Sequence, residues 1–356
     1  MSVLRGDFDL EAIGAVCISG DDGGADVLGA VEELVDSSLL GHSENPAGGF
    51  RWLATVREFA ADALDDAGEV GVVERRHAMH FAQRATRRSA GRGASHPADA
   101  DAVRRDAENH AAALDRVLAL GDDDLVVRLA AGLSLDWYVV GPTMAATDRL
   151  RATIATTSDH SPERAAALRE LGLSLPWSAR TDEAHAVADE LQDIARRRHA
   201  ADIEADALWV RAAIAWVEGD VAAHTDLLER GLSLLRAIDH PTLTVFLFDL
   251  ASVAIRRGEF ERSTQLIQEL DREGRIRHDD LAAARVSLLR SDPAFWSGDV
   301  RAAIGPATQA LASMRTAGLI GPQSDALRSV FDIAVALGDL DLAGRAVSDH
   351  DALVMP

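Results

Sequence analysis

Hydrophobic residues recur at helical spacing along most of this chain, and one short phrase interrupts them at a fixed interval. In each copy a glycine and an acidic residue follow an apolar helical segment. The copies are Gly219-Asp220, Gly258-Glu259, Gly298-Asp299 and Gly338-Asp339. Their glycines lie 39, 40 and 40 residues apart. A fixed period in this range, with an amphipathic pattern on both sides of each phrase, predicts helix–turn–helix repeats that stack into a solenoid.

Extending the period towards the N-terminus places earlier turns near Arg180 and at Gly141, which predicts about six helix pairs over 125–356. Glycine permits the left-handed backbone that ends a helix, and the acidic residue suits the start of the next helix. A small residue usually follows five positions after the turn, although His224 breaks this rule. Because the period exceeds the 34 residues of a standard tetratricopeptide repeat, we predict an all-α, long-period tetratricopeptide-like superhelix.

Residues 1–66 carry a different pattern. Two helices are predicted, from Asp9 to Cys17 and over 26–37, and two short strands follow at 39–42 and 50–53. A helix over 56–66 completes this part, with Thr55 as its cap. Two helices followed by a hairpin are the outline of a winged-helix module. We therefore divide the chain into a winged-helix-like arm (1–66), a helical connector (67–124) and a repeat domain (125–356).

Several phrases in the first part occur in the order and spacing of one known protein class. They are 8–12 (FDLEA), 34–40 (LVDSSLL), 50–60 (FRWLATVREFA) and 75–81 (RRHAMHF). Together they resemble the winged-helix arm of large actinobacterial STAND-class (signal-transducing NTPase) regulators of the LuxR or SARP type. The segment 106–114 (DAENHAAAL) resembles the link from that arm to a tetratricopeptide-like sensor. The resemblance implies a sensor that relays a signal to an NTPase.

The NTPase itself has no counterpart in this sequence. The chain contains no Gly-x-x-x-x-Gly-Lys-Ser/Thr phosphate-binding loop, and the arm lacks its first helix. The resemblance therefore implies the C-terminal part of such a regulator, with an NTPase domain supplied separately. The second predicted helix carries Glu32, Glu33 and Asp36, whose charges oppose contact with phosphates. We expect no direct nucleic-acid binding by this module.

Composition narrows the setting. The 356 residues carry a net charge of −22, which disfavours nucleic-acid partners, and 47% are hydrophobic, enough for a substantial core. Cys17 is the only cysteine and no apolar run approaches the length of a membrane span, so we expect a cytoplasmic protein that does not enter membranes. His77 and His80 have the spacing of a ligand pair but no third ligand nearby, so we expect structural histidines and no metal or other cofactor.

The inner wall of the predicted superhelix is the expected binding surface. Mapping the groove positions of tetratricopeptide repeats onto the first helix of each pair gives these candidates: Trp209, Trp216, Phe248, Arg256, Arg285, Asp292 and Trp296. Such a wall suits a peptide, a protein or a small-molecule effector. The tryptophans can equally be core residues that fill the space between stacked helices.

Catalysis is not expected, because the sequence contains no catalytic motif. A sensor module of a STAND-type regulator is the first hypothesis for function. A free-standing adaptor that binds proteins through the same groove is the alternative, and an inactive gene fragment is a third.

Overall fold

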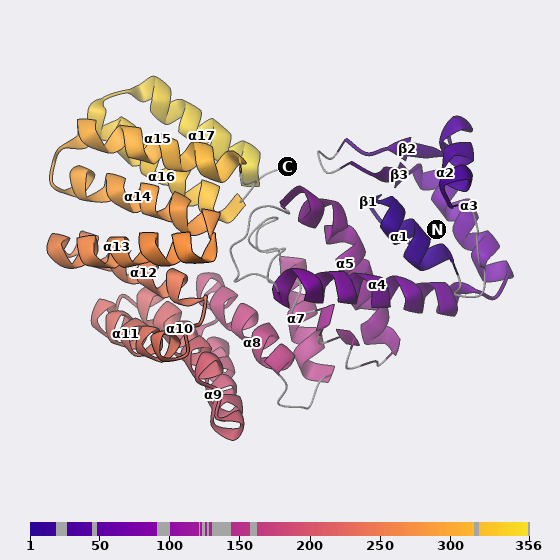
Figure 1. The fold of residues 1–356 in the computed structure, drawn as a ribbon, viewed down its shortest axis with the longest axis horizontal. Helices are drawn as coiled ribbons and strands as arrows, with labels where there is room; N and C mark the ends of the chain where they lie inside the picture. The colour runs from indigo at the N-terminus through magenta and orange to yellow at the C-terminus, as the bar shows by residue number, and fades with distance from the viewer. Residues whose placement is uncertain are drawn as a thin grey trace. The chain divides into compact units, whose positions relative to one another are not determined.

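The structure, a computed structural model, describes residues 1–18, 27–44, 48–90, 100–120, 122, 125–126, 128–129, 144–156, 162–316 and 320–354. These residues are almost entirely helical, as the sequence predicts (Figure 1). Contacts divide the chain into two compact units. The first covers Met1–Gly91, Asp101–Asp136 and Met144–Asp159, and the second is built on His160–Pro356. The boundaries predicted at 66 and 124 stay a prediction.

The second unit is a series of helix pairs (Figure 1). Its helices are α8 (Pro162–Ser174), α9 (Thr181–Arg198), α10 (Ala201–Val217), α11 (Val221–Ala237), α12 (Leu243–Arg256), α13 (Phe260–Arg277), α14 (Asp280–Trp296), α15 (Val300–Thr316), α16 (Ile320–Leu337) and α17 (Leu340–Val354), with the short 3-10 helix η2 (Pro176–Ser178) after α8. Each even-numbered helix packs on the odd-numbered helix that follows it, and α12 also contacts α14 in the next pair. This is the long-period tetratricopeptide-like architecture.

Each repeated glycine ends the first helix of a pair in a left-handed backbone. The φ angles are +82° at Gly219, +73° at Gly258, +93° at Gly298 and +75° at Gly338. At the first of these turns, the N–H of Asp220 donates to the carbonyl of Ala215 at 2.8 Å and that of Gly219 to Trp216 at 3.1 Å. This bonding pattern satisfies carbonyls that a helix end leaves open.

Where the acidic residue of the phrase is aspartate, it then caps the next helix, whereas Glu259 precedes α13 without a side-chain cap bond. A side-chain oxygen of Asp220 accepts a hydrogen bond from the backbone N–H of Ala223 at 2.9 Å. Asp339 accepts one from Leu342 at the same distance. One dipeptide therefore ends one helix and starts the next. The earlier turn predicted near Arg180 has Ala179 in the left-handed region, with φ +56°, while Gly141 lies outside the described residues.

The core of the repeats lies between the two helices of each pair and between neighbouring pairs. Phe246 on α12 is fully buried and packs against α11, where a side chain at Gly231 would come within 2.4 Å of the phenylalanine ring. A glycine in the middle of a helix is unfavourable by itself. The close approach of Phe246 explains why this position has no side chain.

The first unit combines helices with a small sheet. Its elements are β1 (Asp7–Phe8), α1 (Leu10–Cys17), α2 (Val27–Asp36), β2 (Leu40–His42), β3 (Phe50–Trp52), α3 (Ala54–Asp66), α4 (Val70–Ala90), α5 (Ala100–Leu120) and α7 (Met144–Thr156). The strands are antiparallel in the order β1-β3-β2, and Phe50 pairs with both Phe8 and His42.

Two helices followed by a hairpin agree with the order expected for 1–66, and two details differ. The sequence did not predict β1, because two residues are too short to show an alternating pattern. Helix α3 begins at Ala54, so Thr55 lies inside it and Leu53 precedes it without a side-chain cap. Within the described ranges no helix is long and apolar enough to cross a membrane.

Candidate functional site

The first helices of successive pairs line one hollow in the second unit, with a volume of about 590 Å³. This size is within the range of ligand-binding cavities in proteins. Its polar and aromatic lining residues are Trp177, Trp209, Trp216, His224, Phe248, Asp249, Ser252, Arg256, Asp292, Asp325, Arg328 and Ser329. They come from η2, α10, α12, α14 and α16, and His224 alone among them lies on a second helix, α11. We call this space the hollow.

An arginine and a tryptophan from neighbouring pairs meet at the hollow. The guanidinium carbon of Arg256 lies 4.9 Å from the centroid of the Trp216 ring, which is the geometry of a cation–π contact. Arg256 is exposed and forms no ion pair with the described residues. Its charge is therefore available to solvent or to a ligand.

Asp249 is a lining residue that the sequence did not mark. Trp209 donates a hydrogen bond from its indole to this carboxylate. Burial raises the pKa of Asp249, and the nearby charge of Arg285 offsets this only in part. Asp249 forms no ion pair in the part of the chain that the structure describes, and Arg285 acts on it through its charge alone.

Asp292 on α14 is in a similar position. Burial raises its pKa, against a hydrogen bond that Ser291 donates over 3.4 Å and the more distant charges of Arg256 and Arg328. No ion pair to Asp292 occurs within the described ranges. Asp325 and Arg328 differ, because they pair with each other at 3.5 Å and both side chains are 58% exposed.

Arg285 lies below this surface. Its guanidinium carbon is 4.9 Å from the centroid of the Phe248 ring, and the residue is only 8% exposed. Its Nη1 has no hydrogen-bond partner among the described residues. The contact positions the Phe248 ring, and the arginine supplies positive charge beneath it.

His224 occupies the position where most repeats have a small residue. Its Nδ1 lies 2.8 Å from the carbonyl oxygen of Ala212, which can only accept, so Nδ1 carries the proton. The ring lies 5.1 Å from that of Trp216. A histidine at a position where the other repeats have a small residue could have marked this site in the sequence. An imidazole at a helix–helix contact needs a hydrogen-bond partner and room for its ring.

The structure brings most of the predicted candidates together. Trp209, Trp216, Phe248, Arg256 and Asp292 line the hollow, and Arg285 lies beneath Phe248. Trp296 is outside the lining; it is 55% exposed and meets the Phe295 ring edge-on. Sequence reasoning missed Asp249, His224, Trp177 and Arg328, which the fold adds to the same surface.

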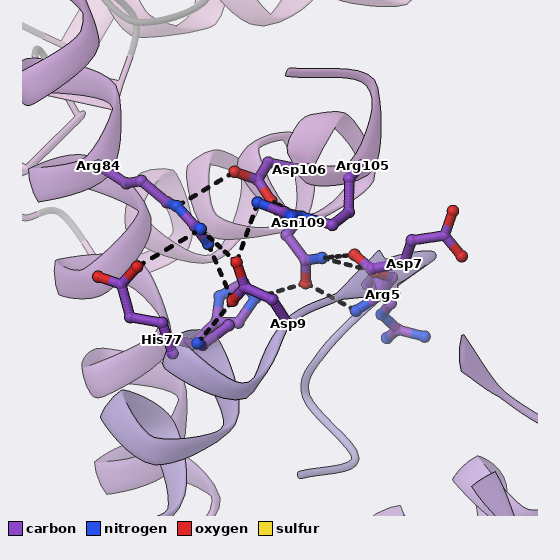
Figure 2. Close-up of polar contacts among 10 residues, drawn as sticks. Arg5, Asp7, Asp9, His77, Arg84, Arg105, Asp106 and Asn109 are labelled. Carbon is purple, nitrogen blue, oxygen red and sulfur yellow. Dashed lines mark hydrogen bonds and ion pairs between the residues drawn. The ribbon is translucent and has the colours of Figure 1, made fainter. Parts of the chain in front are cut away.

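A second cluster of polar side chains lies in the first unit (Figure 2). Asn109 of α5 accepts a hydrogen bond from the backbone N–H of Arg5 at 2.7 Å and donates to the carbonyls of Arg5 and Asp7 at 2.6 and 3.0 Å. The amide therefore acts towards the N-terminal segment as a neighbouring strand would. Because the amide is fully buried, these bonds have no competition from water.

His77 completes this arrangement. Its Nε2 lies 3.1 Å from the side-chain oxygen of Asn109 and must donate, because that oxygen only accepts. Its Nδ1 then accepts from Arg116 at 3.2 Å. Burial, together with the charge of Arg116, lowers the pKa of His77 to about 3. The ring is held neutral, as expected for a structural histidine.

Charged residues continue the cluster, and Figure 2 shows Arg84 between Asp9 and Asp106. Asp106 is fully buried, 3.3 Å from Arg84 and 3.1 Å from Arg105. Burial disfavours the charge on Asp9, but hydrogen bonds from Arg84 and from the backbone of Ala12 outweigh it and lower the pKa to about 2. These contacts join the start of α1 to α4 and α5 and are structural in character.

Comparisons with known proteins place the fold. No known protein-family model matches the chain, and no curated protein matches it significantly. Among solved structures, the Rap protein complexed with Competence and Sporulation Factor is similar, with a TM-score of 0.56 and 11% identity over 69% of this chain and 70% of that chain. At this identity the likeness shows a tetratricopeptide-like helical-repeat fold.

Two further structures match more loosely. A STAND protein with a tetratricopeptide repeat sensor from Pyrococcus horikoshii has a TM-score of 0.48 and 11% identity, over 98% of this chain and 54% of that chain. BtubC from P. vanneervenii has a TM-score of 0.37 and 17% identity, over 67% of this chain and 90% of that chain.

The chemistry of the hollow favours binding. Its lining offers aromatic faces, single carboxylates and guanidiniums, which recognise ligands by stacking and by charge. Among the described residues no group of three or more histidine, cysteine, aspartate or glutamate side chains is placed to hold a metal ion.

Proposed function

We propose that this chain is a non-catalytic sensor module that binds a peptide, protein or small-molecule signal in the hollow of its repeats. One observation carries this proposal: Asp249, Asp292 and Arg256 share one hollow, and none of them is ion-paired within the described residues. The two carboxylates, Asp249 and Asp292, are partly buried, and a partly buried charge without a partner costs stability. Such violations concentrate at functional sites. A ligand that pairs with these charged groups offsets that cost.

The wider setting of the module is also a proposal. The phrases at 8–12, 34–40, 50–60 and 75–81 resemble the winged-helix arm of STAND-type transcriptional regulators, and the arrangement of α1, α2 and the β2–β3 hairpin supports that assignment. On this view 1–66 is the arm, 67–124 the connector and 125–356 the sensor. The sensor reports to an NTPase domain in the cytoplasm, without contacting nucleic acid itself.

The structural likeness supports a sensing role for the repeats. The Rap protein, of similar fold, was solved in complex with Competence and Sporulation Factor. A protein of similar fold therefore forms a complex with such a factor. A free-standing adaptor would use the same hollow. The identity of the bound molecule distinguishes the sensor hypothesis from the adaptor hypothesis.

Native mass spectrometry of the chain isolated from cell extract tests the proposal. The wild-type chain is expected to retain a bound molecule, and a variant with Trp209→Ala and Arg256→Ala is expected to lose it. Trp296→Ala is the matched control, because Trp296 lies outside the hollow. Trp209→Phe alone serves as a milder variant if the double change impairs folding, which circular dichroism reports. A molecule retained equally by the folded double variant would place the binding site elsewhere.

A further inference from the structure

The charges that line the hollow differ in whether they already have partners. Asp325 and Arg328 on α16 face each other at 3.5 Å, so their charges largely cancel. Asp249, Asp292 and Arg256 remain, and they form no ion pair in the described part of the chain. Arg285, stacked on Phe248 outside the lining, adds a second positive charge but pairs with neither carboxylate, so both carboxylates lack a bonded cation among the described residues.

The arginine whose charge acts most strongly on Asp249 does not pair with it. Arg285 lowers the pKa of this carboxyl group through its charge, yet its guanidinium stacks on Phe248 and makes no ion pair with Asp249. The indole of Trp209 supplies one hydrogen bond. A carboxylate accepts about four hydrogen bonds when fully solvated. Asp249 therefore has acceptor capacity left on the side of the hollow.

Asp292 has the same deficit on the neighbouring pair. Within the described residues, the side-chain contact that Ser291 makes with it is long at 3.4 Å, and the same hydroxyl lies 2.6 Å from the carbonyl oxygen of Leu288. Arg256 and Arg328 act on it only through their charges, because neither reaches ion-pair distance. Asp249 on α12 and Asp292 on α14 thus present two incompletely bonded carboxylates to one space.

Aromatic rings complete the surroundings of these carboxylates. Trp177, Trp209, Trp216 and Phe248 line the hollow, and Trp177 is 69% exposed. The faces of aromatic rings attract ammonium and guanidinium groups. Arg256 already makes such a contact with Trp216, and Arg285 makes one with Phe248. Both pairs show that rings of this wall accept cations.

The charge of the whole chain acts in the same direction. At −22, it attracts cationic molecules and repels anionic ones at a distance. An anionic ligand would gain Arg256 but would approach Asp249 and Asp292 within the same hollow. A cationic ligand also approaches Arg256, but it gains two carboxylates and the faces of Trp177 and Trp209.

We propose that the hollow recognises an organic cation, an ammonium or guanidinium group held between Asp249 and Asp292 on the aromatic wall. This inference rests on the proposed function, since it specifies the ligand chemistry of the same site. Two sources supply such a group: a lysine or arginine side chain of a peptide, and a small free amine. Both present the same chemistry to the two carboxylates.

Selection from a defined library tests the inference with the full-length chain. The probe is a random hexapeptide library with acetylated N-termini and amidated C-termini, so that every charge comes from a side chain. Peptides retained by the wild-type chain are sequenced, and the frequency of each residue type is compared with that among peptides retained by Trp209→Ala. In parallel, spermidine and agmatine are titrated by calorimetry, and these two arms separate the peptide source from the small-amine source.

We expect at least a tenfold enrichment of lysine and arginine over aspartate and glutamate in the selected peptides, or calorimetric binding of the amines. Asp249→Asn with Asp292→Asn, which preserves shape, is expected to weaken that binding at least tenfold. Asp226→Asn, at an exposed aspartate outside the hollow, is the matched control and is expected to leave it unchanged.

The remaining outcomes overturn distinct parts of the account. Enrichment of acidic residues, with binding lost in Arg256→Gln, would overturn the cation assignment and leave the proposed function standing. Cation binding that survives in the double asparagine variant would also overturn it. Binding that is the same in the wild type and in folded Trp209→Ala would remove the hollow as the site, and with it both proposals. No binding in either arm would reject the cation assignment.

Discussion

The guanidinium carbon of Arg256 lies 4.9 Å above the centre of the Trp216 ring, although the two residues are 40 positions apart in the sequence. That separation is one repeat period, so the contact joins the ends of the first helices of adjacent pairs. Trp209 and Asp249, hydrogen-bonded to each other, are also 40 apart. The side chains of the inner wall therefore bond from one repeat to the next, and the hollow is built from these contacts.

Removing the charge of Arg256 is expected to change the hollow more than the stability. A cation–π pair at an exposed site contributes about 0.5–1 kcal/mol, so Arg256→Gln should lower the free energy of unfolding by no more than about 1 kcal/mol. It should also shift the tryptophan fluorescence, because the cation leaves the Trp216 ring. Arg257→Gln is the matched control, since Arg257 is exposed and pairs with Glu259 at 2.7 Å. An equal fluorescence shift in both variants would contradict the assignment.

Filling the space at Gly231 is expected to destabilise the repeats. Alanine is the better helix former by about 1 kcal/mol. At this position, however, its methyl group would approach within 2.4 Å of the fully buried ring of Phe246. Overpacking of this kind typically costs about 1–3 kcal/mol, so urea titration should show a net loss of stability.

Gly344→Ala is the control for that change. Gly344 lies in α17, and a side chain there would meet no atom within 4 Å. The substitution should therefore stabilise the chain by several tenths of a kcal/mol or more. If Gly231→Ala stabilised the chain as much as Gly344→Ala, the close packing of α11 on α12 would be wrong.

Neutralising Asp206 is expected to stabilise the chain at neutral pH. Burial raises the pKa of Asp206 to about 6, against the ion pair with Arg169 at 3.3 Å. The folded state thus favours the protonated carboxyl group, and stability falls as pH rises from about 4 to about 6. Asp206→Asn removes the cost of ionising this buried carboxyl group and keeps an oxygen that accepts a hydrogen bond from Arg169.

The gain should reach up to about 3 kcal/mol at pH 7.5 and disappear near pH 4, measured by thermal or urea unfolding at both values. Asp226→Asn, at an aspartate whose side chain is 67% exposed, should change the stability by no more than about 0.5 kcal/mol. A loss of stability for Asp206→Asn at pH 7.5 would show that the ion pair outweighs burial.

His77 makes the first unit sensitive to mild acid. Burial, then the charge of Arg116, lowers its pKa to about 3, whereas in the unfolded chain it protonates near 6.5. Only the unfolded state gains a proton as pH falls through 6.5, so stability decreases from there towards pH 3. By linkage, the loss at pH 5 relative to pH 8 is about 2 kcal/mol.

Calorimetric unfolding across pH 5–8 measures this loss. His77→Gln should flatten the dependence while lowering stability throughout, because the hydrogen bonds to Asn109 and Arg116 are disturbed. His42→Gln, at an exposed position of the same unit, should retain the wild-type dependence. An unchanged slope in His77→Gln would assign the acid sensitivity to other groups.

The local features of the fold were accessible from the sequence. Gly219 and Asp220 predict a turn because each residue type has a specific role at a helix end, and the repeat makes that signal regular. The hairpin β2–β3 could also be predicted, because two short strand candidates flank a segment rich in turn-forming residues. Five of the predicted groove residues face one hollow because helical spacing determines which side of α10, α12 and α14 faces inward.

Contacts between distant residues were not accessible. Asp9 and Arg84 are 75 positions apart, and nothing in either phrase indicates that they pair. Asp249 follows the candidate Phe248 directly, yet its importance depends on Trp209 and Arg285 from two other helices. Trp296 has the right spacing but stands at the exposed end of α14, outside the lining of the hollow. Sequence spacing identifies which face of a helix a residue lies on. Only the three-dimensional structure shows where along the superhelix its side chain lies.

Tryptophan fluorescence during ligand removal and return is the most direct test of the central claim, that the hollow is the binding site. The molecule retained from cell extract is stripped from the chain and added back, and the change in emission is recorded. We expect this change to disappear in the variant with Trp209→Phe and Trp216→Phe and to persist in Trp296→Phe. A change that persists in the first variant and disappears in the second would contradict the account.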